Sequence, residues 1–222
     1  WLSPPEISFL SASQRLPNKL KIAFATNIKP IGNADEKTTQ SVVNTAKKLA
    51  DLGHELIEIP LDLTGLIEPF VKVWQGGVAA AGIPPELLSP LNQWILSQVG
   101  TVGEYLQAVS TMEIIARQII SLFDNFDVLL LPVYMHTPIK IGEWAELSVT
   151  ETFLKIVNWV APCPPFNASG QPAISLPVEF DQETGLPIGL QLVGKPGDES
   201  TIISLASQLE NALSLRNYPV LD

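Results

Sequence analysis

The chain has 222 residues, of which 46% are apolar and 16% are charged, so it can bury a sizeable core as one large domain or two small ones. Its 23 acidic and 13 basic residues give a net charge of −10, which argues against nucleic acid and anionic membrane surfaces as partners, because phosphate groups are bound by clustered Lys and Arg. The single cysteine, Cys163, excludes an internal disulfide and a cysteine-rich zinc site, and we expect no metal.

The cellular compartment of the protein is predicted from the absence of membrane-spanning and signal segments in the sequence. No apolar run approaches the length that a bilayer requires, and the first residues lack the basic and apolar regions of a signal peptide. One cysteine is compatible with a reducing environment, and we expect a cytoplasmic protein. The chain begins with Trp1 instead of Met, and we expect it to be a piece of a longer protein.

The first elements predict a strand-helix-strand unit. Residues 19–26 have the composition of a strand, and Asp35 is suited to cap a helix over 36–52. Gly53 stands where a helix ends in a left-handed residue, and 54–59 predicts the next strand. Such a unit has a right-handed crossover and parallel strands.

The remainder of the chain alternates further helices with strands. Apolar residues recur at helical spacing over 102–123, and 126–133 is a continuous apolar run, typical of a strand covered on both faces. Two short apolar runs joined by the turn 181–185 predict a hairpin. The other helices are expected over 63–81, 84–100, 151–160 and 198–213, and the hairpin strands over 173–180 and 186–193.

These elements predict an α/β fold with one mixed central β-sheet flanked by helices. We divide the chain into an irregular arm, residues 1–18, which is rich in Ser and Pro without a period, and an α/β portion, residues 19–222.

A tight loop is predicted ahead of the first hairpin strand, because Asn167, Gly170 and Pro172 follow one another closely. A loop delivered onto a strand is a common place for backbone groups that bind a ligand. The alternative is a hairpin that only fills the core, and the residue pattern alone favours that alternative.

Three local patterns suggest chemistry but are rejected on their context. Gly189–Lys195 matches the start of a phosphate-binding loop, but Pro196 replaces the hydroxyl residue that binds magnesium. Ser175 and His136 could belong to a serine triad, yet Ser175 lies inside a predicted strand and lacks the sharp turn that exposes a nucleophile. Cys163 has no base near it in the sequence, so we expect a buried or pocket-lining thiol.

Two further groups keep a structural interpretation. His54 follows a helix end, where an imidazole has a structural role. The aromatic residues Phe153, Trp159 and Phe166 are typical of a core, and their closeness to the loop 167–172 leaves a pocket lining as the alternative.

The hairpin and its neighbours resemble the C-terminal part of the amidase signature family. The resemblance covers nearly the whole chain from about residue 19 onward, and its most specific part is the two-part hairpin motif. The matching segments are Phe166–Pro177, Gly185–Gly194, Phe126–Pro132, Leu20–Phe24, Leu52–Glu55 and Asp198–Glu199.

This resemblance implies hydrolysis of an amide C–N bond to a carboxylate and an amine or ammonia, without a cofactor. The family carries a serine nucleophile, a second serine in a cis peptide and a lysine base in a Gly-Ser-rich segment. A Gly-Gly-Ser-Ser-Gly-Gly run is absent from this sequence, and none of its lysines has a comparable setting. We therefore expect no catalytic residue in this chain, which would be inactive without the missing N-terminal catalytic half.

The role that the resemblance assigns to such a C-terminal portion is to complete the sheet and to form one wall of the pocket for a small-molecule amide. The implied substrate-binding residues are Asn167, Gly170, Gln171, Phe166, Cys163 and Trp159. The Ser-Gly-Gln-Pro-Ala form of the motif is similar to that of 6-aminohexanoate-cyclic-dimer hydrolases.

A second hypothesis is a non-catalytic binding or subunit module that partners a separate catalytic chain. In either case apolar surface is expected to remain uncovered, which makes a homodimer possible.

Overall fold

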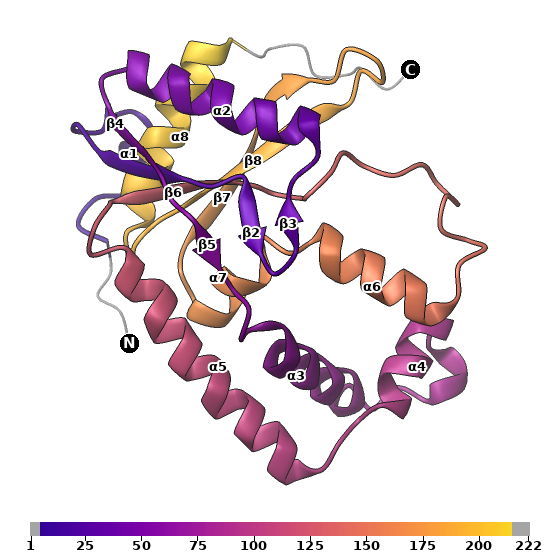
Figure 1. Cartoon of the computed structure of the whole chain (residues 1–222). Helices are drawn as coiled ribbons and strands as arrows, with labels where there is room; N and C mark the ends of the chain where they lie inside the picture. Colours follow the sequence, from indigo (N-terminus) through magenta and orange to yellow (C-terminus); the bar gives the residue numbers. More distant parts are fainter. Residues whose placement is uncertain (1–4, 215–222) are drawn as a thin grey trace.

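The structure, a computed structural model, describes residues 5–214, and its strands form two sheets (Figure 1). The larger sheet has the strand order β4-β1-β6-β8-β7 and the smaller one the order β3-β2-β5. The strands are β1 (Lys21–Phe24), β2 (Asn27–Lys29), β3 (Gly32–Asn33), β4 (Glu55–Glu58), β5 (Leu61–Asp62), β6 (Val128–Pro132), β7 (Ala173–Phe180) and β8 (Pro187–Val193).

Helices lie between β3 and β4, between β5 and β6, between β6 and β7, before β1 and after β8. They are α1 (Phe9–Ser13), α2 (Glu36–Asp51), α3 (Ile67–Ala80), the 3-10 turn η1 (Pro85–Leu87), α4 (Pro90–Ser97), α5 (Val102–Leu122), α6 (Val149–Trp159), α7 (Pro164–Ser169) and α8 (Glu199–Leu213).

The larger sheet is mixed, as the sequence predicted. β1 pairs in parallel with β4 and with β6, while β8 pairs antiparallel with both β6 and β7. The predicted strand-helix-strand unit and the predicted hairpin are therefore confirmed. Every residue of β6 is buried, which confirms that this apolar strand is covered on both faces.

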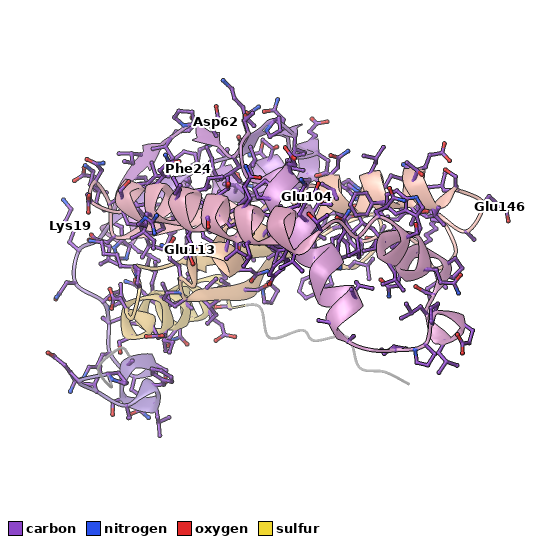
Figure 2. All side chains as sticks on the ribbon, turned by 90° about the horizontal axis from the view of Figure 1, so that it is seen from below. Lys19, Phe24, Asp62, Glu104, Glu113 and Glu146 are labelled. Atoms are coloured by element: carbon purple, nitrogen blue, oxygen red, sulfur yellow. The ribbon has the colours of Figure 1, made fainter. Side chains whose placement is uncertain are left out.

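Each face of the larger sheet packs against its own helices (Figure 1). On one face Ile22, Leu130 and Leu192 pack with apolar residues of α2 and α8. On the other face Leu129 and Val193 pack with residues of α5 and with Phe166 of α7. Seen from below, α5 lies across the front of the molecule and carries the labelled Glu104 and Glu113 (Figure 2).

Helix caps fix the ends of these helices where the sequence places capping residues. The Asp35 side chain accepts from Thr38 N and begins α2, as predicted, and Gly53 follows the helix with a φ of 99°. α5 begins with a reciprocal capping box between Thr101 and Glu104.

Two helical turns lie where irregular chain was expected. Residues 9–13 of the predicted arm form α1, which Ser8 caps, and Ser204 of α8 donates its hydroxyl to Ala12 O. The sequence did not reveal α1 because five residues are too few to show a helical period. In the structure, the helix is held by its contact with α8. The second is α7, which includes Asn167, so the predicted loop is confined to residues 170–172. Pro164 lies in the first turn of α7, and Gly170 ends the helix.

The helix expected over 84–100 is divided into η1 and α4. Ser89 accepts from Asn92 N and caps α4, while Pro90 occupies the first turn. Because a residue that precedes proline avoids the helical region, the chain cannot continue one helix through Ser89.

Lys37, in the first turn of α2, joins this helix to the hairpin turn. Its Nζ lies 2.9 Å from Asp181 Oδ1 and 2.6 Å from Glu183 Oε2. The hydrogen bond from Lys37, together with those from Glu183 N and the Thr184 hydroxyl, holds the pKa of Asp181 below its usual range. The charged form of Asp181 is thus favoured by folding.

We expect Lys37→Met to lower the free energy of unfolding at pH 7 by more than it does at pH 3. A carboxylate whose pKa is depressed in the folded state contributes stability above its unfolded pKa of about 4, and this contribution is lost as the pH falls through the folded value. Urea unfolding of both proteins at the two pH values measures the difference. Lys47→Met, at an exposed position of α2, is the control, and a gap for Lys37→Met that persists at pH 3 would contradict the assignment.

Candidate functional site

The chain segment that leaves β6 is anchored by Gln191 of β8. The buried Gln191 Nε2 donates to Pro132 O at 3.1 Å and to Pro162 O at 3.0 Å. One side-chain amide therefore joins the end of β6 to the segment that precedes α7.

Cys163 and Trp159 hold the next residues of the same segment. Cys163 Sγ donates to Val133 O at 3.3 Å, and Trp159 Nε1 donates to His136 O at 3.0 Å. In the reverse direction, Met135 N donates to Trp159 O at 2.9 Å. These contacts bring two of the sequence-predicted site residues against residues 133–136.

Asp35 fixes this segment from the side of α2. Its backbone N–H donates to Met135 O at 2.7 Å, and its Oδ2 accepts from Thr137 N at 3.3 Å. Oδ1 caps α2 by accepting from Thr38 N at 2.7 Å. One carboxylate thus sets both the start of the helix and the position of the segment after β6.

Trp159 stands in a group of four rings. It lies 4.6 Å from Tyr134, 5.5 Å from His136 and 5.8 Å from Trp144 between ring centroids. The His136 ring is stacked on Trp159 with an interplanar angle of 12°. His136 Nδ1 lies 2.8 Å from Thr137 O, and because a carbonyl only accepts, Nδ1 carries the proton.

The three aromatic residues grouped by the sequence do not form one cluster. Phe153 packs between Trp74 and Trp94 at 5.5 and 5.2 Å, whereas Phe166 lies in the core under α5. Trp159 is separate from both. The sequence could not distinguish these places, because all three side chains satisfy the same apolar pattern.

Cys163 is a thiol with no base beside it. Burial raises the pKa of Cys163, because a thiolate is poorly solvated there. Among the described residues, Cys163 Sγ makes one hydrogen bond, to Val133 O, and a carbonyl oxygen is not a base that could deprotonate the thiol. The thiol is therefore not suited to act as a nucleophile.

The other implied site residues divide into exposed and interior positions. Asn167 and Gly170 are exposed at the end of α7, and Gly170 has a φ of 68°. Gln171 is buried, donates to Gly194 O at 2.8 Å and accepts from Ser169 Oγ at 2.9 Å. Gln171 therefore holds α7 against the end of β8, while Phe166 points into the core.

Of two cavities in this part of the fold, only the smaller is lined by residues of the segment 159–164. The larger, of about 340 Å³, is lined by Tyr134 and His136 together with Ser175 and Gly189 of the hairpin. The smaller, of about 50 Å³, is lined by Val160, Ala161 and Pro164 and by α3.

Ser175 and His136 share the larger cavity, yet they lack the third member of a triad. The His136 Nδ1 proton is directed at Thr137 O and not at a carboxylate, and both Asp35 oxygens are occupied by backbone N–H groups. His54 is also structural, since its Nδ1 accepts from Leu20 N and its Nε2 pairs with Gln208 Oε1 at 2.8 Å.

The roles of Gln191, Tyr134 and Asp35 at this site were not predicted from the sequence. Gln191 lies inside the Gly-Leu-Gln-Leu-Val motif, where a polar residue between buried leucines is a usable signal. Asp35 is predictable only as a cap, because its contact with Thr137 spans 102 residues of sequence.

Neither a metal centre nor a membrane span is found in the part of the chain that the structure describes. Residues 5–214 hold no cluster of three or more His, Cys, Asp or Glu side chains suited to a metal ion. Over the same residues, no helix combines the length and apolar character needed to cross a bilayer.

Gln191→Leu is expected to destabilise the protein by roughly 2–3 kcal/mol, because Pro132 O and Pro162 O would each lose a buried donor. Urea unfolding followed by circular dichroism measures the change. Gln118→Leu on the exposed side of α5 is the matched control and should stay within about 0.5 kcal/mol of the wild type. Equal stability of the two variants would show that the Gln191 amide does not anchor the segment.

Asp35→Ala is expected to speed amide hydrogen exchange at Thr137 at least about tenfold and to destabilise α2 by roughly 1 kcal/mol. The first effect reports the lost acceptor and the second the lost cap. Ser148→Ala removes a cap of the same kind from α6 and should leave Thr137 unchanged. Unaltered exchange at Thr137 in Asp35→Ala would refute the link.

Comparison with known proteins identifies the family. The family model described as Amidase matches residues 2–203. A protein named "Putative amidase" from Synechocystis sp. is 42% identical over 213 residues, which are 96% of this chain and 42% of that protein. A glutamyl-tRNA(Gln) amidotransferase subunit from Nitratiruptor sp. is 37% identical over 88% of this chain and 49% of its own length.

Solved structures show the same fold. The structure of 6-aminohexanoate cyclic dimer hydrolase superposes with a TM-score of 0.79 at 23% identity, over 95% of this chain and 48% of that one. The chain thus spans less than half the length of these relatives. It belongs to the amidase signature family, as its hairpin motif predicted.

Proposed function

We propose that this chain is the part of an amidase that completes the central sheet and forms one wall of the substrate pocket. The reaction of the whole protein is hydrolysis of an amide C–N bond to a carboxylate and an amine or ammonia. The observation that carries the proposal is that residues 159–163 are anchored on the residues after β6, which line the larger cavity together with the hairpin.

The chemistry requires groups that this chain does not bring together. A serine hydroxyl attacks an amide only beside a base, and the resulting oxyanion needs preorganised N–H donors. The sequence has no Gly-Gly-Ser-Ser-Gly-Gly run, and the larger cavity offers Ser175 and His136 without an orienting carboxylate. The nucleophile and base are therefore assigned to a part of the amidase outside these residues.

The hairpin supports the same proposal through the surface it leaves open. β7 is at the end of the strand order, and Ala173, Ser175 and Pro177 are exposed on one of its faces. An uncovered edge strand is a template for pairing with another strand. The catalytic part is proposed to cover this surface, and self-association of the isolated chain through it remains a prediction.

The implied site residues take different roles in this proposal. Trp159, Cys163, Asn167 and Gly170 face or border the substrate, whereas the hydrogen bonds of Gln171 and the burial of Phe166 make these two supporting residues. No cofactor is required, since hydrolysis by a serine nucleophile uses only protein groups and water.

The second hypothesis, a binding or partner module without hydrolysis, has one comparison in its favour. A relative bears the name of an amidotransferase subunit, so this family includes chains that work in multi-chain enzymes. The two hypotheses differ in whether the complete protein hydrolyses the amide that lies against the proposed pocket wall or only binds a partner or ligand.

The purified chain alone is expected neither to hydrolyse an anilide amide nor to be labelled by a serine-directed sulfonyl fluoride. Release of aniline and intact-protein mass spectrometry measure the two properties. Turnover that Ser175→Ala abolishes, while Ser110→Ala on α5 leaves it intact, would show that the chain contains its own nucleophile.

A chimera tests the role of the chain in catalysis. In the Synechocystis relative, this chain replaces the matching 213 residues, and anilide hydrolysis is compared with that of the unmodified relative. We expect hydrolysis within about tenfold of the relative, because the pocket wall is retained. A folded chimera without hydrolysis, beside an active relative, would contradict the proposal and favour the module.

A further inference from the structure

We infer that Gly189 of β8 sets the size of the group that a substrate can place next to its amide in the larger cavity. Gly189 forms part of the lining of this cavity, together with Ser175 of β7 and Val133. The inference rests on the proposed function and deepens it, because it names a specificity-determining position in the pocket beside the proposed wall.

The backbone of β8 does not need a glycine at this position. The φ of Gly189 lies outside the left-handed region that favours glycine, unlike that of Gly185 in the hairpin turn, which is 68°. The register shift of the hairpin lies between Pro177 and Glu179, so the extra residue of this irregularity is Val178 of the other strand. An alanine could therefore adopt the conformation of Gly189.

The packing around Gly189 does not need a glycine either. A Cβ atom at position 189 would lie 3.6 Å from Val133 Cγ2, 3.8 Å from Ser175 Oγ and 3.9 Å from Leu176 O, which are ordinary van der Waals distances. Glycine inside a strand is less stable than alanine, because it loses more conformational freedom on folding. A strand glycine that neither backbone nor packing requires marks a place where a ligand or another backbone approaches closely.

The space left by the missing side chain belongs to the larger cavity. Between Ile188 and Val193, Gly189 is partly exposed and the other residues are buried. Val133 and Ser175, the two side chains nearest to the added Cβ, both line the cavity. A side chain at position 189 would therefore project into the cavity and occupy space that is otherwise open to a ligand.

The polar groups of the cavity select an amide as this ligand. Because His136 Nδ1 carries the proton, its Nε2 can only accept a hydrogen bond, whereas the Ser175 hydroxyl can donate or accept one. Both residues line the cavity. A primary or secondary amide offers an N–H donor and a carbonyl acceptor within one small planar group. The group that contacts Gly189 is then the carbon substituent next to that amide.

Binding of small amides to the chain tests the inference without any catalysis. The valine methyl groups are labelled with carbon-13 and the backbone with nitrogen-15, and the resonances of Val133 and Ser175 are followed during titration. Acetamide and 2,2-dimethylpropanamide differ in branching next to the carbonyl, and N-methylacetamide and N-tert-butylacetamide differ in the same way at the nitrogen. We expect both members of at least one pair to shift these resonances, and that pair identifies the side of the amide that faces Gly189.

Gly189→Ala should narrow the cavity while the protein stays folded. We expect it to raise the Kd of the branched member of that pair at least about tenfold relative to the unbranched member, the factor for one methyl group that a pocket no longer accommodates. The urea midpoint should equal or exceed that of the wild type.

Gly77→Ala on α3 is the matched control. No atom of residues 5–214 lies within 4 Å of a Cβ added at this position, and Gly77 is outside the lining of the cavity. This variant makes the same chemical change, and both amides should bind to it as they do to the wild type.

A lower urea midpoint in Gly189→Ala than in the wild type would overturn the inference, since packing would then require the glycine. An equal loss of affinity for branched and unbranched amides, or no loss for either, would overturn it as well. A wild-type chain that binds none of the amides would do the same and would favour a backbone segment of the catalytic part as the occupant.

Failure of the inference is separable from failure of the proposed function. A chimera that hydrolyses anilides, beside a chain whose amide binding does not depend on Gly189, refutes only the inference. Size-selective binding beside an inactive chimera refutes only the proposed function.

Discussion

The carbonyl groups at the end of β6 impose the constraint on which the site depends. Where the chain leaves a sheet inside the molecule, each buried carbonyl needs a new donor. Here the donors come from distant side chains, namely Gln191, Cys163 and Trp159. Satisfying the backbone after β6 therefore also positions the segment that precedes α7, which we propose as the pocket wall.

The same hydrogen bonds divide roles among the implied site residues. A side chain that already meets its bonding capacity inside the protein has little left for a ligand, and this is the position of Gln171. The Trp159 side chain uses only its N–H for hydrogen bonding, and its ring is stacked on His136. Within the thirteen residues 159–171, a side chain with its bonding capacity used inside the protein is thus separate from one that uses only its N–H.

Two cavities of different chemistry lie in this part of the fold. The larger cavity, between the residues after β6 and the hairpin, has hydroxyl and imidazole groups, whereas the small cavity between α3 and α6 is surrounded by hydrocarbon. The exposed face of β7 adjoins the first of these through Ser175.

The sequence by itself determined the α/β class, the parallel unit, the hairpin and the family, because these depend on local period, turn residues and a contiguous motif. It also predicted the cap at Asp35 and the burial of β6 on both faces. It could not predict α1, whose five residues are held by α8, or α7, whose residues have the composition of a loop. Only the tertiary structure decided that Phe153, Trp159 and Phe166 lie in three separate environments, and that Asp35 and Gln191 meet the segment after β6. The physical reason is that these contacts join residues far apart in the chain, and local patterns do not record which distant group supplies a donor.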